Sequence, residues 1–216
     1  MISVDISSMS RVWYGAIVKE LALSTRQADV IVDFYYYPRR VLRAVTDEAP
    51  AEFTGPVVGF SSVSTPNRPI ALMLGIGQDA QRELGLQELV EPSKTIAFYP
   101  DRAFGYTLDE GRRLFPNASS KPRPYERVQY RLEDPGFVFS VLESIAHGLA
   151  EDWRVLFISV GPKLFSLLGF LLHVRRPSVS VWRISAGTRR VPVDVAAATP
   201  RLSVLRTYWG AGVAMA

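Results

Sequence analysis

The stretch Phe157–Phe165, FISVGPKLF, joins two apolar runs through a Gly-Pro-Lys corner. Three structures fit it: a phosphate-binding turn, a broken membrane-spanning helix, or an ordinary corner between a strand and a helix. The window 155–174 around it has a single charged residue, Lys163, and is long enough to cross a bilayer. A break at Gly161-Pro162 would leave backbone groups without partners in lipid, so we expect a strand, a corner and a helix outside the membrane.

The same succession of strand, turn and helix repeats along the chain. Alternating or continuously apolar runs predict strands at residues 2–6, 28–38, 69–75, 94–101, 125–133, 153–160 and 178–185, with a short edge strand at 56–63. Helical periodicity predicts helices at residues 11–23, 78–90, 137–152 and 162–175, with a short helix or turn at 39–45. This alternation indicates an α/β fold, a Rossmann-like three-layer sandwich built on a mostly parallel sheet.

The predicted elements divide the chain into one domain and a tail. The Rossmann-like domain spans residues 1–186. Residues 187–216 are rich in Ala, Pro and Arg, show no clear period, and are expected to pack on the domain or on a partner. The chain has 216 residues, of which 48% are apolar, so it can bury a sizeable core.

Composition excludes several kinds of site. The chain has no cysteine, which excludes disulfides, thiolate catalysis and cysteine-held zinc. His147 and His173 are too few for a histidine-rich metal site, and no metal is expected. The net charge of +4 permits an anionic ligand and leaves nucleic-acid binding open, although the arginine clusters at 39–43, 112–113 and 175–176 are short. The first residues lack the basic and apolar regions of a signal peptide, so a cytoplasmic protein is expected.

Ligands of such sheets bind beyond the carboxyl ends of the strands, which turns the search for a site into a search of strand ends. The candidate ligand-binding residues are Ser7 and Ser8 after the first strand, Gly75 and Gly77 after 69–75, Asp101 and Arg102 after 94–101, and Gly161 and Lys163 at the opening corner.

The opening corner has the features of an anion site. Pro162 suits the first turn of a helix, and Gly161 lets a ligand approach the backbone closely. The N–H groups at the helix start and the Lys163 ammonium favour a phosphate. The alternative is a structural corner whose lysine reaches the solvent.

The other strand ends allow two interpretations each. Gly75 and Gly77 match the G-x-G-x-x-[GA] spacing of dinucleotide-binding turns, but this turn lies inside the chain and Asp79 would oppose a pyrophosphate. Ser7 and Ser8 can bind an anion or merely cap the following helix. Asp101 and Arg102 can meet a ribose or phosphate, or form a surface pair.

A resemblance supports the first interpretation of the corner. ISVGPKLFSLLGFLL, followed by the strand SVSVWRIS, resembles the strand, Gly-Thr-Lys turn, helix and strand of CARF domains, the Rossmann-like sensors of cyclic oligoadenylates in prokaryotic antiviral defence. The resemblance implies that Gly161, Lys163 and the Ser7-Ser8 turn face a nucleotide or cyclic oligonucleotide, and that the protein forms a homodimer. Pro162 stands where that family has Thr, which removes one hydroxyl contact. The chain as a whole also resembles an uncharacterised bacterial family, through Asp5-Ile6-Ser7, 74–84 and 91–96.

Three functions are therefore carried forward. The first is a non-catalytic sensor or binding module for a nucleotide or another phosphorylated small molecule, acting alone or as a subunit of a defence-type assembly. The second is a nucleotide-processing hydrolase or transferase that uses strand-end carboxylates, for which the candidates are Asp5, Asp33, Asp79 and Asp101. The third is an interaction protein whose partner or second copy covers aromatic residues, for which the candidates are Trp13, Tyr14, Trp182 and Trp209. No cofactor and no catalytic residue follow from the sequence.

Overall fold

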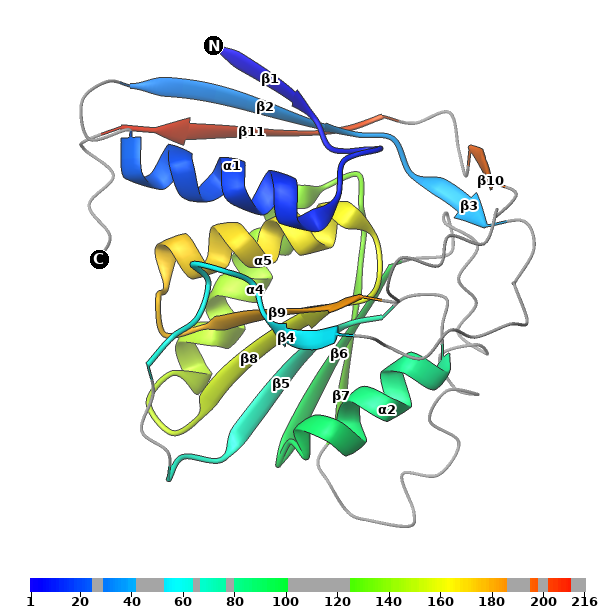
Figure 1. The fold of residues 1–216 in the computed structure, drawn as a ribbon, viewed down its shortest axis with the longest axis vertical. Helices are drawn as coiled ribbons and strands as arrows, with labels where there is room; N and C mark the ends of the chain where they lie inside the picture. Colours follow the sequence, from blue (N-terminus) through cyan, green and yellow to red (C-terminus); the bar gives the residue numbers. More distant parts are fainter. Residues whose placement is uncertain are drawn as a thin grey trace.

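A six-stranded sheet carries most of the predicted alternation in the computed structural model, which describes residues 1–24, 29–41, 53–63, 67–76, 80–100, 125–185, 195–197 and 202–210. Its strands are β4 (Phe53–Pro56), β5 (Ile70–Gly75), β6 (Lys94–Pro100), β7 (Tyr125–Tyr130), β8 (Arg154–Ser159) and β9 (Ser180–Ser185). They lie in the order β4-β9-β8-β5-β6-β7 (Figure 1). All neighbours run parallel except β4, which is antiparallel to β9. The prediction of an α/β fold with a mostly parallel sheet is confirmed.

Helices cover this sheet on both faces. The helix α2 (Ala80–Val90) packs on one face through Leu86, which joins a cluster with Leu72 and Leu74 of β5. The helices α4 (Pro135–Leu149) and α5 (Lys163–Arg175) pack on the other face, against Ala71 and Met73. Alternate residues of β5 thus enter different clusters, which explains why this strand is apolar along its whole length.

A second sheet covers the far side of the helices. It consists of β1 (Ile2–Asp5), β2 (Val30–Tyr36) and β11 (Ser203–Trp209), and α1 (Arg11–Ser24) connects the first two. In this sheet β1 is parallel and β11 antiparallel to β2. Figure 1 shows α1, α4 and α5 between the two sheets. The expectation that residues 2–6 and 28–38 belong to the main sheet is therefore wrong, because strand periodicity does not tell which sheet a strand joins.

Two short segments differ from expectation, and one part of the tail forms a strand. The strand β11 adds residues 203–209 of the predicted tail to the second sheet, where Arg206 lies opposite Asp33. The strand β10 (Val195–Ala197) pairs with β3 (Arg39–Val41), where a helix or turn was expected. The edge strand expected at 56–63 lies at 53–56, as β4. Long-range pairing decided these short elements, and local propensity is a weak guide to such pairing.

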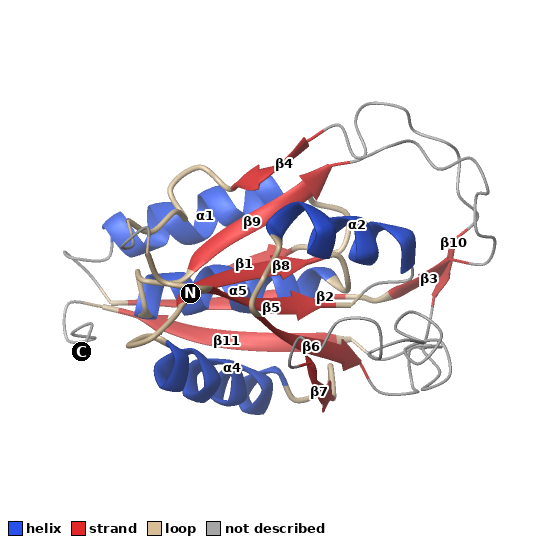
Figure 2. Cartoon of the chain, turned by 90° about the horizontal axis from the view of Figure 1, so that it is seen from below, coloured by secondary structure: helices blue, strands red, loops and turns tan. Residues whose placement is uncertain are grey.

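The central helix α5 is buried along its length. Residues Leu164–Leu172 are all buried, and the Phe165 ring stacks on those of Phe157 and Tyr130 with centroids 5.2 and 4.8 Å apart. Its neighbours in the helical layer are α1 and α4 (Figure 2). Packing between two sheets and two helices explains why this helix is apolar on all sides. Within the described part of the chain, no helix combines the length and apolarity needed to cross a bilayer.

One histidine links the end of α5 to the main sheet, and it makes stability depend on pH. The Nδ1–H of His173 donates to the carbonyl of Val179 at 2.7 Å, and its ring meets the ring of Phe60 edge-on. Burial holds the pKa of His173 below its usual 6.5, although the bond to Val179 opposes this shift. Just below pH 6.5 the unfolded chain consequently binds more protons than the folded protein.

We therefore expect the free energy of unfolding to fall as the pH drops below 6.5, and this fall to flatten in His173→Gln. Urea unfolding at a series of pH values measures it. His147→Gln, which removes the exposed histidine of α4, controls for the loss of an imidazole elsewhere. Equal flattening in both variants would contradict the assignment to His173.

Candidate functional site

The corner between β8 and α5 turns sharply at Pro162. The proline has φ −54° and ψ 143°, so it occupies the N-cap position, one residue before the helical turn in which it was expected. Its carbonyl accepts the first helical bonds, from the N–H groups of Phe165 and Ser166 at 3.1 and 3.3 Å. Pro162 provides no side-chain cap, so α5 begins without one.

Lys163 bridges the two sheets. Its Nζ donates to the carbonyl of Ser7, at the end of β1, over 2.7 Å. The sequence analysis selected both residues, and the structure brings them together although they follow strands of different sheets. Ser7 is held from both sides, because its N–H donates to Asp5 Oδ1 at 2.8 Å and its Oγ accepts from the N–H of Tyr37 at 2.8 Å.

Arg11 is a further residue of the corner, and the sequence analysis missed it. Its Nη2 donates to the carbonyl of Gly161 at 2.7 Å and its Nε to Ser166 Oγ at 2.8 Å. The sequence did carry a signal, since Arg11 begins α1 and Lys163 begins α5. Cations are disfavoured at the positive end of a helix, so each needs compensation from elsewhere.

Two tyrosine hydroxyls complete the polar contacts of the corner. Tyr14 Oη donates to the carbonyl of Lys163 at 3.3 Å, and Tyr36 forms a hydrogen bond with the backbone of Lys163. Burial raises the pKa of both tyrosines, while the nearby Arg11 charge lowers it by a smaller amount. Both phenols consequently stay neutral at physiological pH and bring no negative charge near Arg11 and Lys163.

The floor of the corner is a backbone contact between β8 and β5. The N–H of Val160 donates to the carbonyl of Gly75 at 2.9 Å. A Cβ on Gly161 would overlap the carbonyl oxygen of Ile76, and a Cβ on Gly75 would overlap the ring of Phe165. Close packing therefore requires glycine at both positions. From the sequence, a ligand was expected to be the reason for these glycines.

Ser159 ends β8 directly below this floor. The residue is 6% exposed, and its Oγ has no hydrogen-bond partner among the described residues. The hydroxyl lies 3.0 Å from the point where a Cβ of Gly75 would stand, so it faces the gap between β5 and α5. A buried hydroxyl without a partner is unusual and leaves one donor available at the corner.

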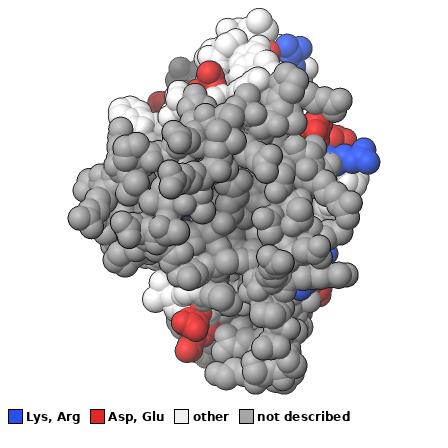
Figure 3. All heavy atoms as spheres, turned by 90° about the vertical axis from the view of Figure 1, so that its right-hand side faces the viewer, with Lys and Arg blue, Asp and Glu red and all other residues white. Residues whose placement is uncertain are grey.

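The remaining predicted residues lie apart from this cluster or outside the described residues. Ser8 is exposed in the turn before α1. Gly77, Asp101 and Arg102 lie outside the described residues, as does Asp79. Figure 3 faces the side of the molecule on which β3 and β10 lie, and the described charged side chains visible there lie toward its margin.

The two candidate carboxylates that the structure describes, Asp5 and Asp33, have structural partners. Asp33 lies within β2 rather than at its end, and its two oxygens accept from Nε and Nη2 of Arg206 at 2.7 and 2.8 Å. This bond holds the pKa of Asp33 below its usual value. Among the residues the structure describes, no group of three or more His, Asp or Glu is placed to hold a metal ion.

No protein-family model matches the chain, and no curated protein matches it.

The floor of the corner gives a matched pair of glycine substitutions. Gly161→Ala places a methyl group against the Ile76 carbonyl and should lower the free energy of unfolding by about 1–3 kcal/mol. Gly85→Ala, on α2, meets no atom within 4 Å and should raise it by about 0.5–1 kcal/mol. Urea unfolding of both variants gives the two values, and a neutral Gly161→Ala would contradict the close approach.

Removing the missed arginine should also weaken the corner. Arg11→Met leaves the Gly161 carbonyl and Ser166 Oγ without their donor, and we expect a loss of about 1–3 kcal/mol in the free energy of unfolding. Arg131→Met, at an exposed position before α4, is the control. Equal stability of the two variants would show that Arg11 does not brace the corner.

Proposed function

We propose that the chain is a non-catalytic, Rossmann-like binding module for an anionic small molecule that carries phosphate, such as a nucleotide. The ligand occupies the carboxyl edge of β5 and β8, over the start of α5. Gly161 and Ile76 form the floor, the positive end of α5 faces the phosphate, and Arg11 and Lys163 supply positive charge. We also propose a cytoplasmic location.

The strand order supports this position. Along the chain, β5, β6 and β7 extend the sheet in one direction, while β8 and β9 extend it in the other. The helix after β5 lies on one face and the helix after β8 on the opposite face. Ligands of open parallel sheets bind where the order reverses in this way. The objection that Gly75 lies inside the chain also loses its force, because β5 is the first parallel strand of this sheet.

The charge at the corner is the observation that carries the proposal. Two helices begin there, and each begins with a cation. Arg11 donates to two neutral oxygens, Gly161 O and Ser166 Oγ, and Lys163 also donates to Ser7 O. Arg11 takes no part in the ion pairs Lys94–Glu126, Arg175–Glu143 and Arg206–Asp33. A phosphate would form stronger, charge-assisted bonds with the same donors and would be favoured by both helix dipoles.

The enzymatic alternative receives less support. Of its four candidate carboxylates, Asp33 is taken by Arg206 and Asp5 accepts the N–H of Ser7. Asp79 and Asp101 lie outside the described residues.

The proposal predicts that phosphate-containing ligands stabilise the protein. The ligands are ATP, cyclic di-AMP, a cyclic tetra-adenylate and inorganic phosphate, and thermal unfolding is the measurement. A ligand present at 100 times its Kd should add about 2.7 kcal/mol to the free energy of unfolding. Lys163→Met should reduce this gain. The gain of the variant is the difference between its free energies of unfolding with and without ligand.

Lys94→Met is the matched control. Lys94 begins β6, at the opposite end of the parallel strands, and pairs there with Glu126 at 2.7 Å. Its removal should leave the ligand-induced shift unchanged. No shift with any of the four ligands, or equal shifts in the two lysine variants, would reject the site.

A further inference from the structure

The hydroxyl of Ser159 is buried at the corner and contributes no side-chain hydrogen bond to the fold. Ser159 is 6% exposed at the end of β8, and its Oγ has no partner among the residues that the structure describes. A buried hydroxyl without a partner lowers the stability of a protein. A partner from outside the chain therefore explains this residue better than packing does.

Ser159 belongs to a row of residues that crosses the main sheet at its carboxyl edge. The parallel register places it opposite Gly75 of β5. When the register of β8 with β9 is continued by one residue, it places Ser159 beside Arg183 of β9. Neighbours in register point to the same face of a sheet, and a Cβ on Gly75 would point at the Phe165 ring of α5. The hydroxyl thus lies between a half-buried arginine and a glycine, on the face that α5 covers.

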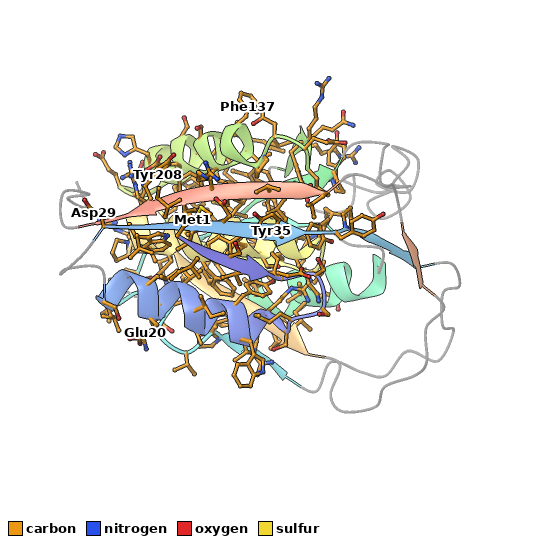
Figure 4. All side chains as sticks on the ribbon, turned by 90° about the horizontal axis from the view of Figure 1, so that it is seen from above. Met1, Glu20, Asp29, Tyr35, Phe137 and Tyr208 are labelled. Atoms are coloured by element: carbon orange, nitrogen blue, oxygen red, sulfur yellow. The ribbon has the colours of Figure 1, made fainter. Side chains whose placement is uncertain are left out.

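The groups around this hydroxyl leave one direction for a ligand. The Phe165 ring lies on the side toward α5, and it stacks on the Phe157 ring of β8 with centroids 5.2 Å apart. Figure 4 views the molecule from the side of the second sheet and shows β1, β2 and β11 lying over α5. A ligand would therefore reach Ser159 along the carboxyl edge of β5 and β8. The close contacts of Gly75 with Phe165 and of Gly161 with the Ile76 carbonyl make this edge narrow.

Three cations gather around the same edge. Arg11, Lys163 and Arg183 bring three positive charges, and Asp5, at the turn of Ser7, brings one negative charge. The positive ends of α1 and α5 add to the positive charge. A terminal phosphate carries about −1.5 to −2 charges at pH 7 on a compact group. A phosphodiester carries a single charge and has a carbon substituent on each side, so both the width and the charge of this edge favour the terminal phosphate.

We propose that the site takes a terminal phosphate group, such as that of a phosphomonoester, and that Ser159 and Arg183 form its inner end; this inference rests on the function proposed above. The Ser159 hydroxyl donates to one phosphate oxygen, and the Arg183 guanidinium pairs with another. Arg11 and Lys163 supply positive charge on the outer side of the same group. The site consequently selects against the cyclic oligonucleotides that the resemblance to CARF domains implies, because all of their phosphates are diesters.

The ligand test compares AMP, a phosphomonoester, with cyclic AMP, the phosphodiester of the same nucleoside, by isothermal titration calorimetry. AMP should bind at least about 10-fold more tightly. In the thermal unfolding experiment, ATP and inorganic phosphate should stabilise the protein more than cyclic di-AMP and cyclic tetra-adenylate do. Preferential binding of the cyclic ligands would overturn this inference and leave the proposed function standing. A protein that bound none of these ligands would overturn both.

Two substitutions test the inner end of the site. Ser159→Ala should raise the Kd for AMP about 10-fold, because one charge-assisted hydrogen bond is lost. Its midpoint of urea unfolding without ligand should not fall, since the hydroxyl has no partner to lose. Arg183→Gln should reduce the preference for AMP over cyclic AMP, because it removes a charge that the terminal phosphate uses more fully.

Ser180→Ala is the matched control. Ser180 begins β9, at the opposite end of the parallel strands. Its Oγ accepts from the N–H of Ser62 at 2.9 Å and shares a hydrogen bond with Ser62 Oγ at 2.7 Å. This variant should unfold at a lower urea concentration and bind AMP like wild type. An unchanged Kd for AMP in Ser159→Ala, or equal increases in both serine variants, would overturn the role of Ser159.

Discussion

The burial of α5 is the constraint on which the rest of the structure depends. Nine consecutive residues of this helix are buried, so it needs apolar neighbours in every direction. The main sheet supplies one side, α1 and α4 supply two more, and the second sheet closes the fourth. A lysine at the start of such a helix would be costly to bury without a partner. Lys163 solves this by extending to the carbonyl of Ser7, which ties the second sheet to the main one at that point.

The same constraint explains why two cations meet at one corner. Because α1 lies beside α5 and both begin near the ends of β1 and β8, their positive ends are close to each other. Arg11 and Lys163 then brace the corner through neutral oxygens of the opposite element. This bracing is effective for folding, and the two oxygens that Arg11 contacts are neutral. The same donors can therefore both support the structure and bind an anion, because their hydrogen bonds to an anion are stronger than those to neutral oxygens.

The sequence predicted the parts of this arrangement that depend on local pattern. Continuous apolar runs located β5 and β8, and the Gly-Pro-Lys sequence located the start of α5 within a residue. It also selected Ser7 and Lys163, and the resemblance to CARF domains implied that both face one ligand, but it did not predict the direct bond between them. What it missed depends on long-range pairing: β1 and β2 form a separate sheet, and β11 completes it from a tail with no helical or strand period. The glycines show a different kind of error. A ligand was expected to explain Gly75 and Gly161, but their close contacts with Phe165 and Ile76 explain them as well.

The helix α1 connects the proposed ligand site to the rest of the structure. Arg11, at its first position, donates to the Gly161 carbonyl. A phosphate that bound the guanidinium would compete with this bond and so act on the position of the α1 start. Thermodynamic linkage requires the converse, since whatever shifts the α1 start must change the affinity for the ligand by the same factor. The sensor function proposed for the corner thus has a physical route away from the ligand, through the helix that carries a ligand contact at its start.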